Sequence, residues 1–157
     1  MSSRELGLIL AQQLLDVEDL HYGLWDSDLD LTLGNLAIAQ QRYSDLLLDT
    51  AAGLLAHLPR PRILDVGCGT GHLAAQMLSR GWEVTAVSPT RALADLARQR
   101  LADFPDSQAR LLEDRFEDLE SHRLGKFDLM LFSESFQYIP LTALFDKLRE
   151  LLSPGSC

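Results

Sequence analysis

Three glycines alternate with other residues over positions 67–71, directly after a short apolar run, and this arrangement constrains the chain most. The run Arg62–Val66 is typical of a buried strand, and apolar residues recur at helical spacing over 73–78. Glycines between a strand and a helix let the backbone turn tightly and approach a ligand closely. We therefore expect a ligand site at this loop, because a purely connecting turn needs fewer glycines.

Strand-like and helix-like segments continue to alternate after this loop. Strands are expected over 62–66, 82–87, 109–113 and 127–132, and helices over 72–80, 88–101 and 140–151. Ser88 and Pro89 are expected to cap and open the second of these helices, and Pro140 the third. The alternation predicts an α/β fold, a Rossmann-like, doubly wound parallel sheet of four strands.

The first 58 residues have a helical pattern. Ser2 or Ser3 caps an expected short helix that reaches Leu14, and a loop over 21–30 follows. Thr32 opens a longer helical pattern that ends before Pro59. This pattern fits either one bent helix or two helices, because Ser44 could cap a second one. The expected inner side carries Leu36, Gln40, Tyr43, Leu47, Ala51 and Leu54. We divide the chain into an N-terminal helical segment, 1–58, and an α/β part, 59–157, within one structural domain.

Composition excludes several classes of partner. The 157 residues include 14 Lys and Arg against 23 Asp and Glu, a net charge of -9, which argues against nucleic acid and anionic membrane surfaces. The apolar runs are too short for an integral membrane segment. Two cysteines, Cys68 and Cys157, make no secreted disulfide framework, so we expect a cytoplasmic protein. His57, His72 and His122 lack metal-ligand spacing, so no metal is expected.

Two kinds of nucleotide ligand compete for the glycine loop. The dinucleotide fingerprint requires a sixth-position glycine, but counting from Gly67 that position is His72. Asp65 would repel a pyrophosphate and attract an ammonium or sulfonium group. S-adenosylmethionine carries both cations and no phosphate. NADP stays open as an alternative, because Arg91 could pair with its 2′-phosphate.

The segment Leu64–Gly71 resembles the first motif of the class I S-adenosylmethionine-dependent methyltransferases. The resemblance implies cofactor contacts from Asp65, Gly67, Cys68, Gly69 and Gly71. Cys68 is a compact loop residue, although a helix N-terminus could lower its thiol pKa.

The resemblance extends to the ends of the next strands. The family's acidic ribose-binding residue after the second strand is replaced here by Ser88, followed by Pro89. After the third strand Asp114 is the adenine-binding candidate, with Arg115 and Phe116 beside the ring; a solvated acidic turn is the alternative.

The exit of the fourth strand is similar to the family's fourth motif. Ser133 and Glu134 would face the methionine end of the cofactor, and Phe136, Gln137 and Tyr138 would border the methyl group or the acceptor. Phe136 and Tyr138 fit equally well as core residues.

The N-terminal part resembles the lid segment of the cyclopropane-fatty-acid-synthase and sterol-methyltransferase branch. Tyr22 is the implied cofactor contact, and Trp25 and Tyr43 are pocket walls or parts of a buried staple. His21 is a general-base candidate, beside Glu134 and Tyr138 as weak catalytic candidates; a hydrogen-bonding role fits His21 as well.

The expected function is methyl transfer from S-adenosylmethionine to a small-molecule or lipid-like acceptor. A non-catalytic cofactor- or partner-binding module and an NADP-binding oxidoreductase fragment are the alternatives. The family's fold has seven strands and only four are visible here, so we expect an N-terminal piece or a shortened product. The apolar strand over 127–132 would then form a sheet edge through which the chain self-associates.

Overall fold

The computed structural model describes Leu14, Glu18, Asp19 and residues 21–156, and the structural account concerns these residues. The short helix expected before residue 14 lies outside them. The described elements are η1 (Leu33–Asn35), α2 (Leu36–Leu55), β1 (Arg62–Val66), α3 (His72–Ser79), β2 (Glu83–Val87), α4 (Arg91–Leu101), β3 (Ala109–Leu112), η2 (Phe116–Asp118), η3 (Ser121–Arg123), β4 (Leu129–Leu131), η4 (Phe136–Tyr138) and α5 (Leu141–Leu151).

The four strands form one parallel sheet in the order β3-β2-β1-β4, which confirms the predicted fold class. Asp65 in β1 pairs in register with Ala86 in β2 and with Leu131 in β4. Because the strands are parallel, their carboxyl ends meet at one edge of the sheet, where open α/β sheets bind ligands.

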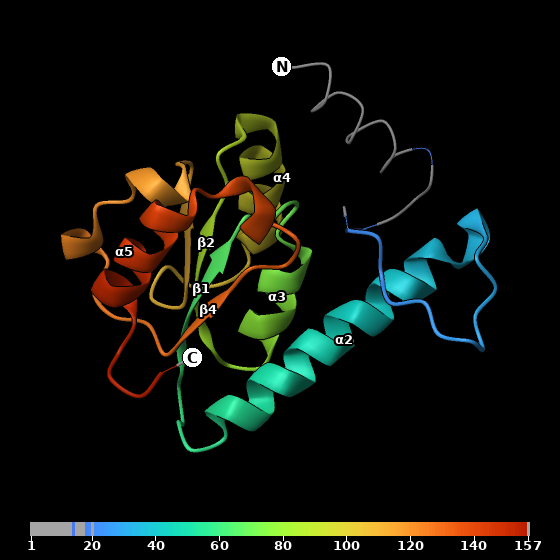
Figure 1. Ribbon diagram of the computed structural model, residues 1–157, viewed down its shortest axis with the longest axis horizontal. Coiled ribbons are helices and arrows are strands. Elements are labelled where there is room, and N and C mark those ends of the chain that lie inside the picture. Colours follow the sequence, from blue (N-terminus) through green and yellow to red (C-terminus); the bar gives the residue numbers. More distant parts are fainter. Residues whose placement is uncertain (1–13, 15–17, 20, 157) are drawn as a thin grey trace.

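Helices cover both faces of the sheet (Figure 1). Ile63 packs on the face shared with α2, α3 and α4, whereas Leu64 packs on the opposite face with η2 and α5. The two neighbours face opposite ways because side chains alternate along a strand. Asp65 therefore belongs to the face that carries α2 and α3.

The long N-terminal pattern forms one helix, α2, preceded by the single turn η1. Its buried residues are Ala39, Gln40, Ser44, Leu48, Ala51 and Leu55. The expected inner side was therefore partly wrong, and Leu54 is 46% exposed. The spacing of apolar residues did not predict the buried side of α2, because the amino-terminal half of this helix buries small and polar side chains. These contact a polar network described below.

The expected start of the helix over 88–101 was also wrong. Thr90 is the N-cap of α4, and the helix begins at Arg91. Ser88 instead continues the sheet direction, since its N–H donates to the Leu112 carbonyl at 3.0 Å and its carbonyl accepts from the Asp114 N–H. The Ser-Pro pair has the sequence pattern of a helix cap, but the backbone of Ser88 forms hydrogen bonds to the neighbouring strand instead.

The fourth strand is shorter than expected, and β4 is the terminal strand of the described sheet. Phe127 forms an isolated parallel bridge with Leu152, in which its N–H donates to Leu151 at 2.8 Å and its carbonyl accepts from Ser153 at 2.9 Å. The predicted sheet edge is therefore partly paired, at Phe127. Asp128 fixes the strand start by accepting the Arg62 N–H at 2.8 Å.

In the part of the chain that the structure describes, no helix combines the length and the apolar character needed to cross a membrane.

Candidate functional site

A cavity of about 690 Å³ opens at the carboxyl edge of the sheet. The ends of β1, β2 and β4 and the turn before η2 contribute to its wall, and so do Asp19, His21 and Tyr22 of the N-terminal segment. Both polar and apolar side chains line it, and the volume lies within the range of small-molecule and cofactor sites. This cavity is the candidate site.

Among the sequence-predicted residues, those that line the cavity are His21, Tyr22, Asp65, Gly67, Cys68, Gly69, Ser88, Pro89, Arg115, Phe116, Ser133, Glu134, Gln137 and Tyr138. Gly71, Asp114 and Phe136 lie outside its lining, as do Trp25, Tyr43 and Arg91. The structure thus brings most of the predicted positions together around one space.

The three loop glycines all have positive φ but different surroundings. A Cβ on Gly67 would lie 2.5 Å from the Cβ of Ser135, so the turn after β4 sits directly on it. A Cβ on Gly69, at φ +56°, would meet nothing within 4 Å. Gly69 is therefore the loop glycine whose open side faces space for a ligand.

Asp65 is buried, with 1% of its surface exposed, yet it lines the cavity. Its Oδ2 receives no hydrogen bond from the described residues. Burial, together with the nearby charge of Asp19, raises the pKa of Asp65 to about 7. An unpartnered buried carboxylate oxygen is costly, and a cationic ligand would satisfy it.

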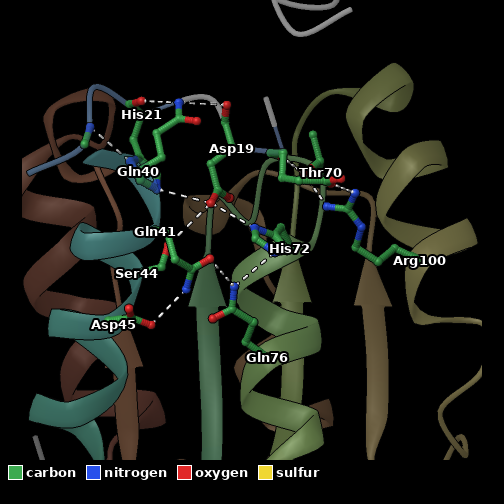
Figure 2. Close-up of polar contacts among 12 residues, drawn as sticks. Asp19, His21, Gln40, Gln41, Ser44, Asp45, Thr70, His72, Gln76 and Arg100 are labelled. Carbon is green, nitrogen blue, oxygen red and sulfur yellow. Dashed lines mark hydrogen bonds and ion pairs between the residues drawn. The ribbon is translucent and has the colours of Figure 1, made fainter. Parts of the chain in front are cut away.

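Asp19 is a second buried carboxylate in the cavity wall (Figure 2). Its Oδ2 lies 2.9 Å from His72 Nδ1, 3.4 Å from the Ser44 hydroxyl and 3.5 Å from His21 Nε2. Burial alone would raise the pKa of Asp19, but the interactions with the two histidines outweigh burial and hold it well below its usual range.

Further hydrogen bonds fix the backbone around Asp19. The Gln40 amide donates to the carbonyls of Asp19 at 3.0 Å and His21 at 2.6 Å. Thr70 donates to the Glu18 carbonyl at 2.7 Å and accepts from Arg100 at 2.9 Å. The N-terminal segment is thereby tied to α2 on one side and to the glycine loop on the other (Figure 2).

The ring of His21 is fixed mainly through its Nδ1, which accepts the Gly23 N–H at 3.2 Å. Its Nε2 lies 3.5 Å from Asp19 Oδ2 and makes no hydrogen bond to the described residues. The ring also packs on Tyr43, with the centroids 4.6 Å apart. These contacts support the hydrogen-bonding interpretation of His21 over the general-base one.

The opposite wall of the cavity carries further charges. Arg115 forms an ion pair with Glu117, which also lines the cavity. Glu134 adopts φ +55°, the left-handed region that disfavours side chains. The next residue, Ser135, donates to the Val66 carbonyl and locks this turn against the glycine loop.

Cys68 lies in the buried part of the loop. Burial, aided by the charge of Asp65, raises the pKa of its thiol above the usual range. The alternative in which a helix N-terminus lowers this pKa is therefore wrong, because desolvation dominates.

Sequence reasoning missed Asp19, Thr70 and Glu117 as cavity residues. Asp19 lies 53 positions before His72, and no local pattern signals a contact over that separation. Thr70 lies between Gly69 and Gly71, and a hydroxyl at that position in the glycine loop was a signal that could have identified it as a cavity residue.

The geometry agrees with the comparisons to known proteins. A model of the family described as "Methyltransferase domain" matches residues 64–157. The chain is 34% identical over 109 residues to a ubiquinone biosynthesis O-methyltransferase of Xanthomonas campestris, covering 69% of this chain and 45% of that protein. A protein of the same name from Alkalilimnicola ehrlichii is 34% identical over 95 residues, 60% of this chain and 38% of the relative. The chain thus spans less than half the length of these relatives.

The fold also resembles solved structures. Geranyl diphosphate C-methyltransferase from Streptomyces coelicolor A3(2) aligns over 92% of this chain and 56% of its own, with a TM-score of 0.68 and 21% identity. A glycopeptide N-methyltransferase aligns over 72% of this chain and 47% of its own, with a TM-score of 0.58 and 23% identity. These likenesses establish the fold. Because the family model covers more than half of the sequence, the chain belongs to the methyltransferase domain family, within the class I S-adenosylmethionine-dependent methyltransferases that its glycine loop resembles.

Proposed function

We propose that this chain binds S-adenosylmethionine in the cavity and supports methyl transfer to a small-molecule acceptor. The observation that carries the proposal is the buried Asp65, which lines the cavity and whose Oδ2 receives no hydrogen bond from the described residues. A ligand with a cationic group would supply the missing partner. S-adenosylmethionine has such a group in its ammonium, so the residues present fit the cofactor.

The charges of the wall favour this cofactor over NADP. Four acidic residues line the cavity: Asp19, Asp65, Glu117 and Glu134. Among the described residues, the only arginine in the lining is Arg115, which forms an ion pair with Glu117. A phosphate-bearing dinucleotide would be repelled there. Arg91, the residue on which the NADP alternative rests, lies outside the lining.

Several chain groups would hold the cofactor. Asp65 binds the ammonium, and the open side of Gly69 lets the loop backbone approach. Tyr22, Gly67, Cys68, Ser88, Pro89, Arg115, Phe116 and Ser133 complete the proposed contacts, all from the cavity wall. Gly71 and Asp114 lie outside the wall, so we propose that they act on the loop shape and not on the ligand.

S-adenosylmethionine supplies an already activated methyl carbon, so the chain needs to orient donor and acceptor and exclude water. Glu134 and Tyr138 stand at the wall on the side of η4, where an acceptor would enter. Tyr22 is 81% exposed and Tyr138 60% exposed, which gives the site aromatic surface for a partly apolar acceptor. The relatives' names, with ubiquinone biosynthesis and geranyl diphosphate, support an acceptor of this lipid-like class.

We further propose a cytoplasmic location, supported by the cysteine usage, and self-association through the outer edge of β4. We also propose that an N-terminal helical segment, 1–58, and an α/β part, 59–157, form one structural domain. Their shared apolar core, in which α2 packs with α3 and the sheet, supports this.

Calorimetric titration with S-adenosylhomocysteine and with NADP tests the binding. We expect the first to bind and the second not to bind; tighter binding of NADP would overturn the proposal. Mass-detected methyl transfer to a quinol-type or isoprenoid acceptor then tests the reaction. Binding without transfer to any acceptor would favour the non-catalytic cofactor-binding module.

A further inference from the structure

Resting on the proposed function, we propose that Asp19 is a second carboxylate for the cofactor's ammonium group, with His72 as its positioning residue. Asp65 supplies the first carboxylate from the sheet, and Asp19 supplies the second from the N-terminal segment. Asp19 then recognises the amino-acid end of the cofactor directly.

The placement of the Asp19 carboxylate supports this role. Its contacts with described side chains, His72, Ser44 and His21, all go to Oδ2. Oδ2 thus anchors the side chain, and Asp19 lines the same cavity as Asp65.

His72 has the geometry of a positioning residue. It is the first residue of α3, and its Nδ1 lies 2.9 Å from Asp19. Its Nε2 lies 3.0 Å from the Gln76 side-chain amide, one turn further along α3. Gln76 can donate to Nε2, which leaves the proton on Nδ1 to be donated to Asp19. The ring thus holds the carboxylate through a hydrogen bond.

The electrostatics explain why two carboxylates stand together. Burial and, after it, the charge of Asp19 raise the pKa of Asp65, so the two carboxylates oppose each other when both are charged. A cation at the wall they share would compensate both, because opposite charges within a few ångströms interact strongly in a partly dehydrated site. The Oδ2 of Asp65, which receives no hydrogen bond from the described part of the chain, is the independent observation that points to a cationic ligand here.

Asp19→Asn in the full chain tests the assignment, with two probes measured by calorimetry. S-adenosylhomocysteine carries the ammonium, whereas 5′-methylthioadenosine has the adenosine part without it. We expect Asp19→Asn to lower the affinity for S-adenosylhomocysteine by roughly tenfold to a hundredfold, which is the usual cost of losing a hydrogen bond to a charged group. The affinity for 5′-methylthioadenosine should stay within about twofold of the wild type, since this probe does not reach the carboxylates.

Asp49→Asn is the matched control, because Asp49 is an exposed carboxylate on α2, 3.4 Å from Arg80 and outside the cavity. It should leave both affinities unchanged. If Asp19→Asn lowers the affinity for both probes equally, the proposal is overturned and Asp19 is a purely structural anchor. Unchanged affinity for S-adenosylhomocysteine in Asp19→Asn would overturn it too, while leaving the proposed function intact.

If wild-type protein does not bind S-adenosylhomocysteine, the proposed function fails and this inference fails with it. Should Asp19→Asn not fold, His72→Ala decides the question, because alanine has no polar side-chain group and the 2.9 Å contact is lost while the carboxylate stays in place. A selective loss of S-adenosylhomocysteine binding supports the assignment, and an unchanged ratio of the two affinities overturns it.

Discussion

Gly71 lies so close to Ala97 that a Cβ on Gly71 would be 3.0 Å from both the Cα and the Cβ of Ala97. Gly71 precedes α3 and Ala97 belongs to α4, so the third loop glycine lets two helices approach each other. Gly69, by contrast, has open space on its side. One short motif therefore combines a packing glycine with a glycine available to a ligand.

We predict that Gly71→Ala destabilises the fold with little direct effect on ligand contact. The new Cβ would combine a left-handed backbone with a helix–helix clash, which together cost about 2–4 kcal/mol of unfolding free energy. Urea denaturation measures this loss, and calorimetry on the folded fraction should give S-adenosylhomocysteine affinity close to that of the wild type. A large loss of affinity in protein of wild-type stability would show that Gly71 contacts the ligand.

Gly69→Val should abolish or strongly weaken S-adenosylhomocysteine binding, because its side chain would occupy space beside the loop backbone. The matched control is Gly81→Val, since Gly81 also has a positive φ and open surroundings but lies outside the cavity. Both changes should cost about 1–2 kcal/mol of stability through backbone strain. Only Gly69→Val should lose binding; equal binding in the two variants would place the ligand elsewhere.

The strands and the site edge were predictable because both depend on local patterns. Runs such as Ile63–Val66 are mostly apolar, and a parallel sheet buries runs of this kind between helix layers. Asp65 was predictable for the same reason, as the one charge in that run, two residues before the first glycine.

The details that failed depend on contacts between distant segments. Ser88 and Pro89 satisfy a local capping pattern, but the backbone of Ser88 pairs with Leu112 and delays the helix to Arg91. Gln40 and Ser44 are buried against Asp19, so the inner side of α2 is partly polar. Apolar periodicity has no means of registering such a polar contact.

Asp65→Asn should change how stability depends on pH. The pKa of Asp65 is raised to about 7 in the folded protein, while the unfolded chain has an ordinary carboxyl pKa. Between about pH 4 and 7 the folded state therefore binds more protons, so this group's contribution to stability falls as pH rises. Melting temperatures of Asp65→Asn relative to wild type should rise from acidic to alkaline pH. A constant difference would show that Asp65 does not titrate in this range.

Cys68 should react slowly with thiol reagents, because burial and the raised thiol pKa suppress the thiolate. In a Cys157→Ser background, mass spectrometry should show little alkylation of native protein near neutral pH and full alkylation in denaturant. S-adenosylhomocysteine should slow the native reaction further, since Cys68 lines the cavity. Rapid alkylation of the native protein would contradict the buried placement.

The outer edge of β4 provides the last prediction. The N–H of Phe127 points outward to Leu151 and that of Asp128 points to β1, so by strand alternation the N–H groups of Leu129 and Leu131 also point outward. The bridge to Leu152 covers only Phe127, and β4 contains no charge or proline to blunt the edge. Sedimentation velocity should therefore show concentration-dependent self-association.

Leu131→Pro removes an outward donor without removing a hydrogen bond to β1, so it should shift the equilibrium toward monomer. Leu131→Ala is its control, because it loses the same apolar side chain and keeps the N–H. Self-association that persists equally in both variants would assign it to another surface. A wild-type chain that remains monomeric at all concentrations would mean that the Phe127–Leu152 bridge protects the edge.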